Sequence, residues 1–210
     1  MSRVVRRVAS LLCALALVAC TIGDGEGSVT SDDLKAKDCF RGPYDLGPTF
    51  FASNPYRDQQ LIRIQRGDDM EENSDGVMIL VRNTGAVRAK LGQPLKVGLG
   101  PGVSPPGIPI QADADPPLVS ITLYLHQTCH GKNIALYATE GTITFSSLFS
   151  GDQNEKDGGE KLSEGTFEVL MGDPREQPSS GAPIPPETLS KVKGSFRFYF
   201  QRGQPAQPFG

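Results

Sequence analysis

Both histidines of this 210-residue chain and one of its four cysteines fall within five positions, HQTCH at 126–130. Imidazole and thiolate groups are ligands for zinc and other soft metals, and they also serve in nucleophilic catalysis. The upstream alternation predicts a strand over 118–128, on which His126 and His130 would lie about 13 Å apart, too far for straightforward chelation of one ion. Zinc sites usually need three or four ligands. The spacing therefore predicts two surface histidines and no metal site.

Three further stretches resemble functional motifs and depart from them. Ser104 in GVSPPG lacks the final glycine of a nucleophile elbow. The acidic stretch 151–165 lacks the glycine and the glutamate of a calcium loop, and GLGPG at 98–102 lacks the spacing of a phosphate-binding turn. The sequence therefore assigns no catalytic residue and predicts no cofactor.

The first residues have the layout of a secretory signal peptide. Arg3, Arg6 and Arg7 precede an apolar run from Val8 to Val18, and polar residues follow at once. A transmembrane helix needs about 20 apolar residues, so this run is too short to span a bilayer. The segment is predicted to direct export and then to be removed.

The end of this segment, Leu17-Val18-Ala19-Cys20, resembles the lipobox of bacterial lipoproteins. The resemblance implies cleavage before Cys20, a diacylglycerol on its sulfur and an acyl group such as palmitate on the new amino terminus. Thr21 stands where an aspartate often retains such proteins in the inner membrane, so the resemblance implies anchoring in the outer membrane. We therefore expect a signal peptide at 1–19, a flexible Gly-rich tether at 20–33 and a folded domain at 34–210.

The cysteine count follows from this layout. Cys13 leaves with the signal and Cys20 carries the lipid, which leaves Cys39 and Cys129 in an oxidising compartment. A disulfide between them is the prediction. If they were reduced, they could bind a soft metal together with His126 and His130, and this alternative stays open.

Composition limits the partners. Without the three signal arginines the chain keeps 18 basic residues against 24 acidic ones, a net charge near −6. No basic patch is visible in the sequence, so nucleic acid is excluded as an electrostatic partner. The length of the mature chain fits one domain, and its ten phenylalanines and five tyrosines supply a core.

Alternating segments predict an all-β domain, an antiparallel sandwich or open barrel with long Pro- and Gly-rich loops. Apolar side chains alternate with polar ones near 62–64, 119–125, 143–149, 167–171 and 196–200, and residues 77–81 form a continuous apolar run. Three of these segments open with Gly followed by Thr or Ser, which we interpret as turns.

The remaining segments are less regular. A hairpin is expected to turn at His130, and strands are expected near 86–91 and 94–99. Short helices are expected at 31–37 and 186–192, where capping residues or proline precede them.

Tyrosines and cations on polar strand faces suggest a binding surface. If their strands are neighbours, one face would carry Tyr124, His126, Tyr137, Arg197 and Tyr199. Rings with polar tips suit a glycan of the envelope or a protein partner, whereas ordinary cross-strand aromatic pairing or a second buried layer is the alternative for the same residues. The sequence thus favours a lipid-anchored binding or envelope-structural module over an enzyme; the alternative is a surface hydrolase acting on envelope glycans or other polymers.

Overall fold

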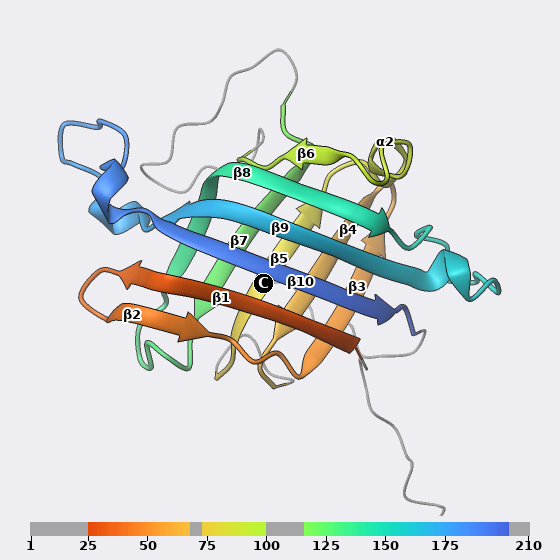
Figure 1. The fold of residues 1–210 in the computed structure, drawn as a ribbon, viewed down its shortest axis with the longest axis horizontal. Coiled ribbons are helices and arrows are strands. Elements are labelled where there is room, and N and C mark those ends of the chain that lie inside the picture. Colours follow the sequence, from red (N-terminus) through yellow and green to blue (C-terminus); the bar gives the residue numbers. More distant parts are fainter. Residues whose placement is uncertain (1–24, 68–72, 100–115, 202–210) are drawn as a thin grey trace, which may run out of the picture.

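Residues 25–67, 73–99 and 116–201 are described by a computed structural model, shown in Figure 1. They form one antiparallel sheet of ten strands in the order β2-β1-β10-β9-β8-β7-β5-β4-β3, with β6 paired to β8. The strands are β1 (Gly25–Ala36), β2 (Phe40–Asp45), β3 (Phe50–Tyr56), β4 (Gln59–Gln65), β5 (Asp75–Val81), β6 (Pro94–Lys96), β7 (Val119–Leu125), β8 (Ala135–Ser147), β9 (Leu162–Gly172) and β10 (Ser190–Tyr199). The predicted all-β class is confirmed.

The sheet curls until its two halves face one another. Figure 1 shows β1, β2, β9, β10 and the second half of β8 as a front layer that crosses over β3, β4, β5 and β7 behind it. Strand β8 joins the layers: Ala135–Tyr137 pair with β7, whereas Tyr137–Ser147 pair with β9. The fold is therefore an open half-barrel with sandwich-like layers.

A bulge in β8 bends the strand from the back layer into the front layer. The register shifts between Ala138 and Glu140, and Gly141 follows with φ +127°, a conformation that other residues rarely adopt. A Cβ on Gly141 would also lie 2.4 Å from the Glu168 carbonyl oxygen on β9. Only glycine fits where β8 turns from one layer into the other.

The core lies between the two layers. Every second residue of the predicted strands points inward, as the alternation required. The largest fully buried side chains are Phe51, Phe145, Phe149, Phe196, Phe198, Leu34, Leu46, Ile62, Ile64, Ile79, Ile121 and Leu123. In β5, Val77, Ile79 and Val81 are fully buried, whereas Met78 and Leu80 on the other face are only partly covered.

The two ends of the sheet meet at a seam. Phe51 of β3 lies against the first residues of β1, where a Cβ on Gly25 would be 2.7 Å from the Phe51 ring. The same ring stacks on Phe198 of β10, with centroids 6.1 Å apart. Glycine at the start of β1 therefore lets the front layer close over β3.

Four sequence predictions are wrong here: the tether beyond residue 24, the helix at 31–37, the strand near 86–91 and the helix at 186–192. Residues 25–33, assigned to the tether, and 31–37, assigned to a helix, lie in β1 or in the turn after it, because β1 pairs with both β10 and β2. The strand expected near 86–91 is absent: residues 84–88 form a short helix, α2 (Thr84–Arg88), because the Asn83 side chain accepts a hydrogen bond from Ala86 N, and residues 89–92 form a turn. The helix expected at 186–192 is one 3-10 turn, Pro186–Thr188, followed by β10. Two further 3-10 turns are η2 (Gly159–Lys161) and η3 (Pro174–Glu176).

Cys39 and Cys129 form the predicted disulfide, with Cα atoms 5.8 Å apart. It joins the turn between β1 and β2 to the turn after β7.

Within the described ranges, no helix is both long and apolar enough to cross a membrane. The signal peptide, Cys20 and Ser104 lie outside the described residues.

Candidate functional site

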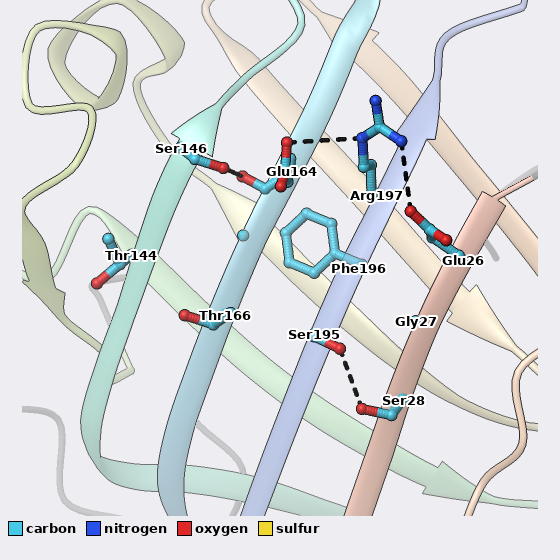
Figure 2. Close-up of a pocket in the computed structure, with 11 residues that line it drawn as sticks. Glu26, Gly27, Ser28, Thr144, Ser146, Glu164, Thr166, Ser195, Phe196 and Arg197 are labelled. Atoms are coloured by element: carbon cyan, nitrogen blue, oxygen red, sulfur yellow. Dashed lines mark hydrogen bonds and ion pairs between the residues drawn. The ribbon is translucent and has the colours of Figure 1, made fainter.

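A polar trough crosses the outer face of the front layer (Figure 2). Its volume is about 470 Å³, and its lining comes from four adjacent strands, β1, β10, β9 and β8. The side chains that define it are Ser28, Ser195, Thr166 and Thr144 on the floor and Glu26, Arg197, Glu164 and Ser146 along one wall. A second hollow, lined by Lys35–Arg41, Glu176, Glu187 and Thr188, has Thr188 as its only hydroxyl side chain.

The floor is a row of hydroxyl groups. Ser28 pairs with Ser195, Ser195 with Thr166, and Thr166 with Thr144, so one hydroxyl stands on each strand. Neighbouring strands lie about 4.8 Å apart, which makes the row about 14 Å long. The Ser28 and Ser195 hydroxyl oxygens are 3.0 Å apart and share a hydrogen bond. The row therefore presents donors and acceptors at a regular spacing.

Arg197 holds the wall together. Its Nη1 lies 3.3 Å from Glu26 Oε1 and its Nε lies 3.7 Å from Glu164 Oε2, as the dashed lines in Figure 2 show. Both carboxylates of the trough therefore face the same guanidinium. This is the arrangement of a cross-strand ion network.

A second row of charges flanks the floor on its other side. Strand register places Thr30, Lys193, Glu168 and Thr142 there. Lys191 Nζ and Lys193 Nζ lie 2.5 and 3.5 Å from the Glu168 carboxylate, and the hydrogen bond from Lys191 lowers the pKa of that carboxyl. Short Ser and Thr side chains between two rows of longer charged ones leave a depression, which is why a trough crosses this otherwise regular face.

The sequence missed the trough although it contains a signal for it. The three Gly-Thr or Gly-Ser pairs interpreted as turns lie inside strands, at Gly141 in β8, Gly165 in β9 and Gly194 in β10. A Cβ on Gly194 would lie 2.3 Å from the Phe167 ring. Gly165 and Gly194 make room for the Phe196 and Phe167 rings, and the Thr166 and Ser195 that follow them point outward onto the trough floor.

The HQTCH residues form a turn and no strand. Strand β7 ends at Leu125, whose carbonyl accepts a hydrogen bond from Cys129 N. The buried Asp75 carboxylate accepts hydrogen bonds from the backbone N–H groups of Gln127 and Thr128, at 2.9 and 3.0 Å, and from the Thr128 hydroxyl. Cys129 is engaged in the disulfide. Across the three described ranges, no three side chains of the His, Cys, Asp and Glu types gather as a metal site needs.

The structure brings together three of the five residues proposed as a binding face. The Tyr124 and His126 rings lie 5.6 Å apart, and Tyr137 lies beside them on β8, opposite Thr122 of β7. Burial, with a contribution from the charge of Tyr137, raises the pKa of Tyr124 to about 12, and burial also raises the pKa of Tyr137. These half-buried rings form one cluster on the outside of the back layer.

Arg197 and Tyr199 do not join this cluster. They lie on β10, which is separated from β8 by β9, and they pair with Glu164 and Leu162. Glu164 in turn pairs with Ser147, at the far end of β8 from Tyr137 and about 30 Å along the strand. Arg197 lines the trough, and Tyr199 stands exposed at the end of β10.

The raised pKa of Tyr124 predicts a specific alkaline titration. Since an unfolded tyrosine ionises near pH 10, the fold favours the neutral phenol, and this stabilisation is complete below pH 10 and lost as the pH rises through about 12. Tyr124→Phe should remove one component with a midpoint near 12 from the ultraviolet tyrosinate titration. Tyr137→Phe should move that component to lower pH, because the neighbouring charge is gone. An unchanged titration in both variants would contradict the assignment.

Comparison with known proteins gave no matching family, no matching curated protein and no matching solved structure.

Proposed function

We propose that the chain is a lipid-anchored binding module of the bacterial outer membrane, and that the polar trough receives a hydroxyl-rich glycan strand of the envelope. The observation that carries the ligand class is the floor of the trough, on which four hydroxyl groups follow one another across four strands. Each hydroxyl donates one hydrogen bond and accepts two, as the hydroxyl groups of a sugar do. A regular row of such groups is complementary to a polymer that repeats them.

The wall supports the same ligand class. Arg197 has five N–H donors in a planar fork, and its two ion pairs leave N–H groups that can reach a ligand above the floor. No side-chain hydrogen bond joins the Thr144 or Thr166 hydroxyl to another residue of the described ranges, so both can bond to a ligand. The proposed ligand therefore meets polar groups across the whole width of the trough.

The anchor is supported by separate features. The lipobox at Leu17–Cys20 supplies the attachment site, and the disulfide fits a compartment outside the reducing cytosol. Two or more acyl chains, at about 0.8 kcal/mol per buried CH₂, hold a protein on a membrane stably. The domain would then present its trough within the envelope, close to glycan.

The test is co-sedimentation of the full-length protein, in detergent, with purified peptidoglycan sacculi. We expect the wild type to bind and Thr166→Val to weaken binding about tenfold, because the valine keeps the shape and strand preference of threonine and removes the central hydroxyl. Thr142→Val is the matched control, since Thr142 is exposed on the same strand as Thr144 but lies in the flanking row, outside the residues that line the trough. It should bind like the wild type.

Two results would contradict the proposal. Equal binding by Thr166→Val and Thr142→Val would remove the trough as the site. Release of soluble fragments from the sacculi would show that the protein cleaves the polymer and is an enzyme.

A further inference from the structure

Aromatic side chains lie at the end of the domain where β1 begins and β10 ends. Gly25, the first residue of β1, pairs with Phe198, and Tyr199 and Phe200 follow directly on β10 and beyond it. The Phe200 ring stacks on Phe149, with centroids 4.0 Å apart. In Figure 1, β1 starts and β10 ends on the same side of the molecule.

This end of the domain continues onto the back layer through the loop after β8. A Cβ built on Gly151 would lie 4.0 Å from Pro55, which immediately precedes Tyr56 at the tip of the hairpin between β3 and β4. We call Tyr56, Tyr199 and Phe200 the aromatic rim; Phe149, which is fully buried, packs beneath Phe200. Its members come from both layers: Tyr56 ends β3 in the back layer, and Tyr199 ends β10 in the front layer with Phe200 directly after it.

Two rim side chains are unusually exposed. Among the described residues, only three large apolar side chains are classed as exposed, and two of them are Tyr56 at 65% and Tyr199 at 45%. The Arg57 guanidinium lies 5.2 Å from the centroid of the Tyr56 ring. Arg57 has φ +58°, a left-handed conformation that glycine adopts with less strain than arginine does.

The length of the chain before β1 places this rim near a membrane. Only Thr21–Asp24 separate Cys20 from Gly25. Five peptide steps span at most about 17 Å, whereas the 12 residues of β1 extend over about 40 Å. A lipid on Cys20 would therefore hold the rim end of the domain near the headgroups, with the disulfide end farther along β1.

We propose that the aromatic rim docks on the phospholipid surface that holds the Cys20 acyl chains, with Tyr56 and Tyr199 seated among the headgroups. This inference rests on the proposed lipid anchor. Tyrosine favours such interfaces because its ring is apolar and its hydroxyl is polar, and an arginine beside it can contact phosphate. Because the tether is short, it keeps the rim close to the membrane and raises the effective concentration of the rim there. A weak contact is then enough for docking.

Charge near the rim fits a zwitterionic surface better than an anionic one. Acidic side chains of the adjacent 150–160 loop bond to the loop itself: Asp152 accepts from Asn154 N, and Glu155 accepts from Lys156 N and Asp157 N. These acids would still repel an anionic surface.

Docking on the rim would leave the trough, which begins at Glu26–Ser28 on β1, opening sideways just above the membrane.

The absence of tryptophan from the sequence allows a direct test. Tyr56→Trp and Tyr199→Trp each introduce a single fluorophore into the rim, and His130→Trp introduces one at an exposed position beside the disulfide, at the other end of the domain. The full-length variants are reconstituted in phosphatidylcholine–phosphatidylethanolamine vesicles that contain brominated lipid, and intact mass confirms the acyl groups on Cys20. We expect quenching of both rim fluorophores to exceed that of the His130→Trp fluorophore several-fold, with little dependence on salt.

The outcomes separate the docking from the anchor. An acylated protein whose three fluorophores are quenched equally would overturn the docking and leave the anchor standing. In that case sedimentation of the same samples would show whether a second copy of the chain covers the rim instead. A protein without acyl groups would overturn both the anchor and the docking that depends on it.

Discussion

Replacing Cys39 and Cys129 together by alanine is expected to lower the free energy of unfolding by about 4 kcal/mol. The bridge joins residues 90 positions apart, and the chain-entropy argument for a loop of that length gives roughly 4 to 5 kcal/mol as an upper value. Cys129 is also 3% exposed and belongs to the main core, so its removal loses some packing as well. For a domain of this size the loss corresponds to a fall in Tm of roughly 10 °C.

Urea unfolding of the oxidised wild type and the double variant, followed by circular dichroism, measures this difference. Reducing agent should lower the stability of the wild type toward that of the variant and leave the variant itself unchanged. Because a disulfide restricts the unfolded chain, the urea slope should increase in the variant. A double variant within about 1 kcal/mol of the oxidised wild type would show that the bridge contributes little to this fold.

Strands with a strict alternation could be predicted because the order of apolar and polar residues within each strand shows which side chains are buried. Phe196 and Phe198 in β10, like Phe167 and Val169 in β9, point into the core, and charged residues between them point out. Period-two patterning depends only on neighbours in the chain, so it can be recognised without knowing which strands pair.

Strand β1 could not be recognised in the same way. Its first half has Val29 as its only large apolar residue, with glycines and polar side chains around it. These residues are extended because β10 pairs with them, and Gly25 is needed where Phe51 closes the seam. A segment whose strand character depends on a partner about 170 positions away resembles a flexible tether when it is considered alone.

The trough was missed for a related reason. Ser28 and Ser195 share a hydrogen bond across 167 positions, and the complete row needs four strands in one register. Exposed Ser and Thr residues are common in strands and carry no local signal of their own. Conversely, the proposed tyrosine face assumed that β10 adjoins β7 or β8, and β9 separates them.

Asp75→Ala is expected to destabilise the fold by about 3 to 5 kcal/mol. The carboxylate is fully buried at the start of β5 and accepts hydrogen bonds from the Tyr44 hydroxyl, from the Thr128 hydroxyl and from the backbone N–H groups of Gln127 and Thr128. Alanine leaves these donors without an acceptor, and each buried donor left unsatisfied costs about 1 to 3 kcal/mol. The turn that carries Cys129 would lose its attachment to β5.

Asp75→Asn separates hydrogen bonding from charge. The amide oxygen can still accept from the two backbone N–H groups, and the Tyr44 and Thr128 hydroxyls can rotate to accept from the amide nitrogen. The loss should then be about 1 to 2 kcal/mol, because only the charge assistance disappears. Asp45→Ala, which removes an exposed carboxylate that accepts from Gly47 N, should change the free energy of unfolding by less than about 1 kcal/mol. If urea unfolding gave Asp75→Ala and Asp45→Ala equal stabilities, the buried carboxylate would not be what holds the turn, and the disulfide alone would fix Cys129 against the sheet.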